Sequence, residues 1–191
     1  MDNLGQRLDS LTGATVLWLG LGNPDGGDDA AGLRLAEGLE SMHVPGVAFA
    51  GLHPEQWISR IEMPRGAHLV FLDAADFGAQ PGAVAFLSAD EMQARFPQIS
   101  THRIALSTLA RLVLTRGAAQ AWLLGIQPAS LRAGQNLSPV VEFTTNLLLR
   151  LLVRRFRPGQ ESSTCFRCPT PDRTESAPGS GPAHFTRSPR T

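Results

Sequence analysis

Three segments of the chain carry side chains that could perform hydrolytic or metal chemistry. Asp28 and Asp29 precede a helical pattern, Asp73 ends an apolar run at 67–73, and His102 lies in a polar segment before another helix. One carboxylate is enough to cap a helix N-terminus, so the second acid of the pair is available for chemistry. We expect Asp28 to be the cap or structural acid and Asp29 to face the site. Two carboxylates and one imidazole can bind a borderline divalent ion such as nickel or zinc, with room left for substrate.

Two other residues compete for a place in this site. Asp76 follows Asp73 by three residues, but its loop position favours solvation, whereas Asp73 stands at a strand end. An acid after a strand can also serve only as a turn or cap residue, and for Asp73 that alternative stays open. His53 ends another apolar run and rivals His102. The residues alone favour His102 only slightly, because it lies in a long loop before a helix, where functional groups often reside.

The elements that must position these groups alternate along the chain. Apolar runs predict strands, and amphipathic patterns between them predict helices. The expected strands are 16–21, 47–52, 67–73, 83–87 and 119–126, and the expected helices are those around 33–39, 54–63, 105–116 and 140–156. Such alternation is typical of a parallel sheet covered on both faces. If the first strand lies between the second and third, Asp29 and Asp73 both emerge in the crevice at the carboxyl ends of the strands.

One connection is too short for that pattern. Only nine residues separate 67–73 from 83–87, whereas a parallel crossover needs roughly a dozen or more. The strand at 83–87 should therefore return antiparallel and make the sheet mixed. An acidic turn at Asp90 and Glu91 should then lead into a loop at 96–101.

The domain organisation follows from composition. We expect a polar leader at 1–13, one domain at 14–156, and a disordered tail at 157–191, where large apolar residues are few. Cys165 and Cys168 lie in this tail with the spacing of half a zinc site, and we interpret them as reduced thiols in an unstructured segment.

Composition and missing motifs exclude several functions. The 191 residues include 17 basic and 17 acidic side chains, so charge offers no reason to expect a nucleic-acid or membrane partner. No signal peptide or 20-residue apolar run is visible, which predicts a soluble cytoplasmic protein. Asp25 stands where a dinucleotide fingerprint starting at Gly20 needs its third glycine. The chain also has no Gly-x-Ser-x-Gly elbow and no His-Glu-x-x-His helix.

The motifs, taken together, resemble those of one enzyme family. Gly-Asn-Pro at 22–24, Gly-Asp-Asp at 27–29 and Ala-Gly-Leu at 31–33 resemble the first motif of the hydrogenase maturation proteases. VFLDAADFG at 70–78, Ser-Thr-His at 100–102 and LGIQP at 124–128 continue the resemblance in the same order, over about residues 15–155. The last of these segments, LGIQP, resembles the corresponding segment of the proteases that process formate-hydrogenlyase-type hydrogenases.

The resemblance implies a fold, a reaction and a site. The implied fold is an α/β three-layer sandwich with a mixed five-stranded sheet and one antiparallel strand. The implied activity is an aspartyl-type endopeptidase that removes the C-terminal extension of a hydrogenase large-subunit precursor. The metal-contacting residues of the family carry over onto Asp29, Asp73 and His102. The metal is nickel already inserted in the precursor rather than an ion held permanently by the protease.

Two alternatives remain open at this point. Peptidyl-tRNA hydrolases share a strand that ends in Gly-Leu-Gly-Asn-Pro, but their next segment carries a catalytic His and Asn, and residues 25–31 hold neither. The second alternative is a non-catalytic chaperone that binds nickel or the precursor without cutting it.

Overall fold

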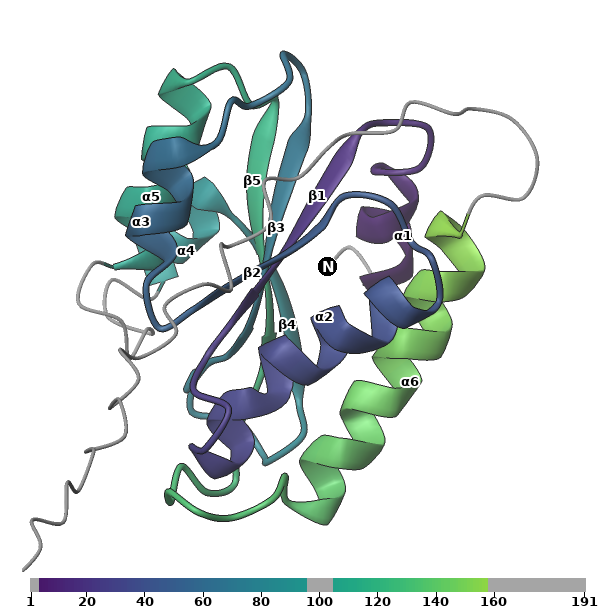
Figure 1. Ribbon diagram of the computed structural model, residues 1–191, viewed down its shortest axis with the longest axis vertical. Helices are drawn as coiled ribbons and strands as arrows, with labels where there is room; N and C mark the ends of the chain where they lie inside the picture. The colour runs from purple at the N-terminus through teal and green to yellow at the C-terminus, as the bar shows by residue number, and fades with distance from the viewer. Residues whose placement is uncertain (1–3, 96–104, 158–191) are drawn as a thin grey trace, which may run out of the picture.

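The computed structural model describes residues 4–95 and 105–157, which form three layers. A five-stranded sheet lies in the middle, with α3, α4 and α5 against one face and α1, α2 and α6 against the other (Figure 1). The elements are α1 Leu4–Asp9, β1 Val16–Leu21, the 3-10 turn η1 Gly27–Ala30, α2 Ala31–Ser41, β2 Val47–Gly51, α3 Pro54–Arg60, β3 His68–Ala74, β4 Val84–Ser88, α4 Ala89–Arg95, α5 Leu106–Thr115, β5 Gln120–Ile126 and α6 Pro139–Phe156.

The strand order in the sheet is β2-β1-β3-β5-β4. β1 pairs in parallel with both β2 and β3, and β3 pairs in parallel with β5. β4 pairs antiparallel with β5, so the prediction from the short 74–82 connection is confirmed. The first strand does lie between the second and third, which places the carboxyl ends of β1 and β3 side by side.

Both faces of the central strands are buried, because side chains alternate between two hydrophobic cores. Leu19 of β1 and Phe71 of β3 belong to the core beneath α3, α4 and α5. Trp18 and Val70 belong to the core beneath α1, α2 and α6. This two-sided burial explains why β1 and β3 appear in the sequence as continuous apolar runs.

The predicted strands and the helices at 54–63, 105–116 and 140–156 are present, with ends shifted by a few residues. Two expectations were wrong. Residues within the expected polar leader form α1, because Leu4, Leu8 and Leu11 recur at helical spacing, and Leu8 and Leu11 are fully buried. The acidic turn at Asp90 and Glu91 is instead the first turn of α4, where acids favour the helix dipole.

Several expectations lie outside the described residues. They are the 96–101 loop, His102, and the tail from residue 158 onward with Cys165 and Cys168. No helix in the described parts of the chain is long and apolar enough to cross a membrane.

Candidate active site

The turn after β1 is built to hold Asp29 against the sheet. Asn23 starts it: its Oδ1 accepts a hydrogen bond from the Asp25 amide at 3.1 Å, and its carbonyl accepts one from the Gly26 amide at 3.0 Å. Gly22 adopts a φ of 115°, and a Cβ there would lie 1.8 Å from the Asp29 carbonyl oxygen. A side chain at position 22 would therefore push the backbone of Asp29 away from the end of β1.

Asp29 itself is 9% exposed, and its two carboxylate oxygens differ in their contacts with the described residues. Its Oδ2 accepts a hydrogen bond of 2.9 Å from the Asn23 amide. Its Oδ1 is buried and has no hydrogen-bond partner among the residues that the structure describes. Buried carboxylate oxygens are normally satisfied, so this atom is a ready acceptor for a cation, a water or a substrate group.

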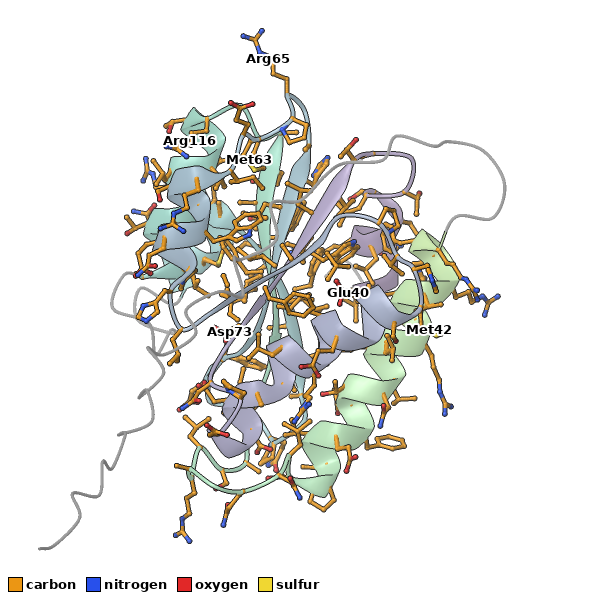
Figure 2. All side chains as sticks on the ribbon, viewed as in Figure 1. Glu40, Met42, Met63, Arg65, Asp73 and Arg116 are labelled. Atoms are coloured by element: carbon orange, nitrogen blue, oxygen red, sulfur yellow. The ribbon has the colours of Figure 1, made fainter. Side chains whose placement is uncertain are left out.

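Asp73 lies at the carboxyl end of β3, beside the end of β1, and is 1% exposed (Figure 2). The register aligns Leu72 with Gly20, so Asp73 stands level with Leu21, just before the turn that carries Asp29. By strand alternation Asp73 faces the α3, α4 and α5 side, as Phe71 does. The two predicted acids therefore come to the carboxyl ends of adjacent strands.

Helix α2 lies unusually close to these strand ends. A Cβ at Gly32 would meet the Leu72 carbonyl oxygen at 2.0 Å and the Leu21 carbonyl oxygen at 2.7 Å. Only glycine allows this approach, which brings the start of α2 and the preceding η1 turn against β1 and β3. The helix thus fixes the depth at which Asp29 sits above the sheet.

Asp28 is structural, as expected, but it does not cap a helix. Neither η1 nor α2 has a side-chain cap. The Asp28 carboxylate is fully buried and binds a loop about one hundred residues away. Its Oδ2 accepts hydrogen bonds from the Ala129 amide (2.8 Å), the Ser130 amide (2.9 Å) and the Ser138 hydroxyl (2.8 Å), and its Oδ1 accepts one from the Ser138 amide (2.5 Å).

The charge on Asp28 is stabilised by these donors. Burial alone would raise the pKa of Asp28, but the hydrogen bonds from Ser138, Ser130 and Ala129 outweigh it and hold the pKa below its ordinary value. The Asp28 amide also donates to the Ser130 carbonyl at 3.0 Å, and the Gly134 amide donates to the Asp25 carbonyl at 2.8 Å. The 128–138 loop and the turn that carries Asp29 are therefore one hydrogen-bonded unit.

Asp76 is exposed and belongs to a different arrangement. Gln127 donates to Asp76 Oδ1 at 3.0 Å and lowers the pKa of that carboxyl, with a second contribution from the Gly78 amide. Gln127 Oε1 accepts from the amides of Phe77 (2.9 Å) and Ala79 (3.2 Å). Gln127 and Asp76 together hold the turn that follows Asp73 in place. Sequence reasoning missed this role of Gln127, although the residue lies in the LGIQP segment.

The described histidines lie away from the two acids or at the surface. His68 begins β3 at the amino end of the sheet, where burial lowers its pKa and the Trp122 indole donates to its Nδ1 at 3.3 Å. His53 is exposed at the end of β2, with Nδ1 3.5 Å from Glu55 Oε1. Within residues 4–95 and 105–157, no three or more His, Cys, Asp or Glu side chains are placed to hold a metal.

His102, the predicted third member of the site, lies outside the described residues. It belongs to the connection between α4 and α5, two helices that cover the face toward which Asp73 points. Its place in the site therefore stays a prediction.

A surface groove lies between two helices on the other face of the sheet. It has a volume of about 660 Å³ and runs between α2 and α6, with Arg34, Gly38, Asn136 and Asn146 among its lining residues. Gly27 and Ala30 of the η1 turn also line it, but neither Asp29 nor Asp73 does. Asp73 faces the other side of the sheet from α2 and α6. The groove is therefore separate from the strand ends where the two predicted acids lie.

Two buried carboxylates at adjacent strand ends can do one of two things. They can bind a divalent cation through oxygen, or one of them can accept a proton from a water molecule that attacks a carbonyl. Both uses need at least one carboxylate oxygen that is not already committed to a backbone donor, and Asp29 Oδ1 meets that condition within the described structure.

Comparisons with known proteins identify one family. A family model described as hydrogenase maturation protease matches residues 33–154. Hydrogenase 3 maturation protease of Escherichia coli K12 is 33% identical over 116 residues, which cover 60% of this chain and 73% of that protein.

Solved structures give the same result. The crystal structure of the nickel–iron hydrogenase maturation protease HycI from Thermococcus kodakarensis superposes with a TM-score of 0.67 at 27% identity, covering 78% of this chain and 97% of that one. The solution structure of the endopeptidase HycI from Escherichia coli superposes with a TM-score of 0.60 at 26% identity, covering 71% of this chain and 87% of that one.

The three-layer fold and these relatives define a hydrolase of peptide bonds. The chain belongs to the hydrogenase maturation protease family. This membership decides against the peptidyl-tRNA hydrolase alternative, and the relatives' names as proteases or endopeptidases favour an enzyme over a non-catalytic chaperone. Asp73 lies within the segment that the family model matches, whereas Asp29 precedes it.

Proposed function

We propose that this protein is a cytoplasmic endopeptidase that removes the C-terminal extension of a nickel-loaded hydrogenase large-subunit precursor. The observation that carries the proposal is the placement of two buried acids, Asp29 on the turn after β1 and Asp73 at the end of the adjacent strand β3, in a chain of this family. The relative named hydrogenase 3 maturation protease supports a precursor of the hydrogenase 3 type. The resemblance of the 124–128 segment is the reason to expect a hydrogenase of the formate-hydrogenlyase type.

The nickel ion in this proposal belongs to the substrate. Asp29, Asp73 and His102 contact the nickel that the precursor already carries, so cleavage proceeds only on a loaded precursor. Carboxylate oxygen and imidazole nitrogen suit this borderline ion. The buried Asp29 Oδ1, which has no partner among the described residues, supports the fit because such an atom gains most from a cation.

The reaction is hydrolysis of one peptide bond. A carboxylate of the site accepts a proton from water, the water oxygen bonds to the scissile carbonyl carbon, and the C–N bond breaks as the amine takes up a proton. Asp28 takes no part in these transfers, because both of its oxygens are committed to the 128–138 loop.

The test is trimming of purified large-subunit precursor, loaded with nickel or left metal-free, followed by intact-mass spectrometry. Wild-type protein should shorten the loaded precursor at one C-terminal bond and leave the metal-free precursor intact. Equal trimming of both forms would refute the nickel requirement. Stable binding of the loaded precursor without any cut would return the chaperone alternative.

A further inference from the structure

The outward face of α6 carries an unusual row of side chains. Val140, Phe143 and Leu147 are 43%, 64% and 48% exposed, and Arg150 and Arg154 are exposed one and two turns later. Their spacings of three and four residues place them in one row along the helix. We call this row, Val140–Phe143–Leu147–Arg150–Arg154, the α6 stripe. It is apolar in its first half, basic in its second, and about 21 Å long.

Exposed apolar side chains concentrate in this part of the described chain. The exposed large hydrophobic residues are Met42, Leu52, Leu112, Leu131, Val140, Phe143 and Leu147. Four of these seven lie in the 128–138 loop or the first half of α6. A folded protein leaves such a cluster uncovered mainly where another molecule binds.

The α6 stripe begins beside the candidate active site. Ser138, the residue before α6, binds the Asp28 carboxylate through its amide at 2.5 Å and its hydroxyl at 2.8 Å. Asp28 is next to Asp29 on the η1 turn. Phe143 follows Ser138 by five helical residues, a rise of about 8 Å. A protein that sits on the stripe is therefore held within reach of the acids.

The charge pattern of the stripe distinguishes between possible occupants. No carboxylate in the described structure forms an ion pair with Arg150 or Arg154. A second copy of the chain would oppose arginine to arginine if the helices ran parallel, or arginine to apolar side chains if they ran antiparallel. The segment 158–191 holds three acids and four arginines, so its net charge does not complement the stripe.

A lipid surface is also a poor match. Basic side chains attract an anionic membrane by about 1 kcal/mol each, and the stripe supplies only two in a chain of zero net charge. A protein surface with an apolar patch bordered by carboxylates would satisfy both halves of the stripe. The apolar half and the basic half of the stripe together favour this occupant.

We propose that the α6 stripe is a docking surface for the folded body of the hydrogenase large-subunit precursor. The precursor places apolar side chains on Val140, Phe143 and Leu147 and carboxylates on Arg150 and Arg154. The inference rests on the proposed function, and it adds a recognition surface outside the acids that do the chemistry. It makes the protease select a folded substrate rather than an isolated C-terminal peptide.

The experiment compares stripe variants with matched controls. Phe143→Ser removes the most exposed apolar side chain, and Leu112→Ser on α5 is its control, because Leu112 is 42% exposed on the other face of the molecule. Arg150→Glu/Arg154→Glu reverses the basic half. Arg60→Glu/Arg65→Glu is its control, because it changes the charge equally at two exposed arginines, and Arg65 lies at the opposite end of the sheet from Asp73 (Figure 2).

For each variant, trimming of nickel-loaded precursor is followed over a range of precursor concentrations, and binding to immobilised precursor is measured separately. We expect the stripe variants to raise KM and Kd at least tenfold with kcat within twofold of wild type. The controls should change neither constant more than twofold, and all melting temperatures should agree within a few degrees. Unchanged KM and Kd in the stripe variants, or equal losses in the controls, would overturn the docking surface.

The remaining outcomes separate the inference from the proposed function. Wild-type protein that binds precursor through the stripe but does not cut it would refute the function and leave the docking surface. Trimming that does not depend on the stripe would refute the docking surface and leave the proposed function. Sedimentation of the wild-type protein and its binding to anionic vesicles test the two other occupants, a second copy and a membrane. A wild-type dimer that Phe143→Ser dissolves, or vesicle binding that the stripe variants lose, would assign the face to another occupant and overturn the inference.

Discussion

Two regions of the molecule hold buried or half-buried acids by different means. At the α1–β4 edge, Glu91 receives two hydrogen bonds from the Arg7 guanidinium, at 2.5 and 2.7 Å, and Arg7 also donates to the Phe86 carbonyl. At the carboxyl end of the sheet, Asp28 and Asp29 receive their hydrogen bonds from backbone amides and one serine hydroxyl. No arginine or histidine among the described residues pairs with either of these two acids.

The difference shows what each region can do. The Glu91 charge is neutralised by Arg7, so the ion pair joins α1 to the first turn of α4. The Arg7 bond to the Phe86 carbonyl adds the edge strand β4 to this contact. Backbone amides hold Asp28 and Asp29 in place without cancelling their negative charge. Asp28 uses both oxygens for that task, whereas Asp29 Oδ1 has no partner among the described residues. The first region joins elements of the fold, and the second leaves a buried carboxylate oxygen for the cation or proton that we propose it binds.

The largest expected effect is loss of activity on removing the charge of Asp29 or Asp73. Asp29→Asn and Asp73→Asn should each reduce trimming of nickel-loaded precursor by about 100-fold or more, because a ligand or general base is lost. The two changes combined should add little further loss, since the groups act as a unit. His102→Ala should behave in the same way. The measurement is a trimming time course, with melting temperature as the folding control. Full activity in both Asp variants would remove the metal-site hypothesis.

Asp28→Asn should instead lower stability. A capping role would predict little cost, because Asn also caps helices well. Asp28 instead accepts hydrogen bonds from a distant loop, and an amide group would direct N–H groups at the donors of Ala129, Ser130 and Ser138. We now expect a loss of about 2–4 kcal/mol in the free energy of unfolding, read by urea titration.

Ser138→Ala provides the graded control for Asp28. It removes one donor of the four and keeps the charge, so it should cost about 1 kcal/mol. If Asp28→Asn were as stable as wild type, the bonds between η1 and the 128–138 loop would not hold the turn in place.

Glu91→Gln tests the other region through pH. The Arg7 hydrogen bonds lower the pKa of Glu91 from 4.5 to about 2, so the ionised form is favoured in the folded protein. Its stabilisation is complete above pH 4.5 and is lost as the pH falls toward 2. The variant should lose about 1–2 kcal/mol at neutral pH, a figure discounted for partial solvent exposure. Urea titrations should show a flatter dependence on pH between 4.5 and 2 than wild type, with trimming unchanged at neutral pH.

The smallest effect concerns metal removal. If nickel arrives with the precursor, the purified protein should contain far less than one metal ion per chain, and a chelator should leave its melting temperature unchanged. Elemental analysis after gel filtration and dialysis is the measurement. Stoichiometric nickel or zinc that survives dialysis would make the metal a resident cofactor and would change the meaning of the open Asp29 oxygen.

The amino-acid sequence by itself determined the order of the strands along the chain and the antiparallel direction of β4. The apolar runs of β1 and β3 are buried on both faces, and the nine residues before β4 are too few for a parallel crossover. Sequence also predicted that Asp29 and Asp73 lie at the same edge of the sheet, because acids that follow the carboxyl ends of parallel strands share that edge. These inferences use local spacing, which the chain carries explicitly.

Only the tertiary structure decided which groups Asp28 binds and which side chains of α1 and α6 are buried or exposed. The donors to Asp28 lie between Ala129 and Ser138, and no local pattern reveals a contact across a hundred residues. Residues 4–11 look polar as a segment, yet Leu8 and Leu11 are buried because α1 covers an edge strand. The apolar residues of α6 likewise show helical spacing on more than one side. Which side stays exposed depends on where the sheet, α1 and α2 already lie, because burial is a property of the assembled layers and not of the helix alone.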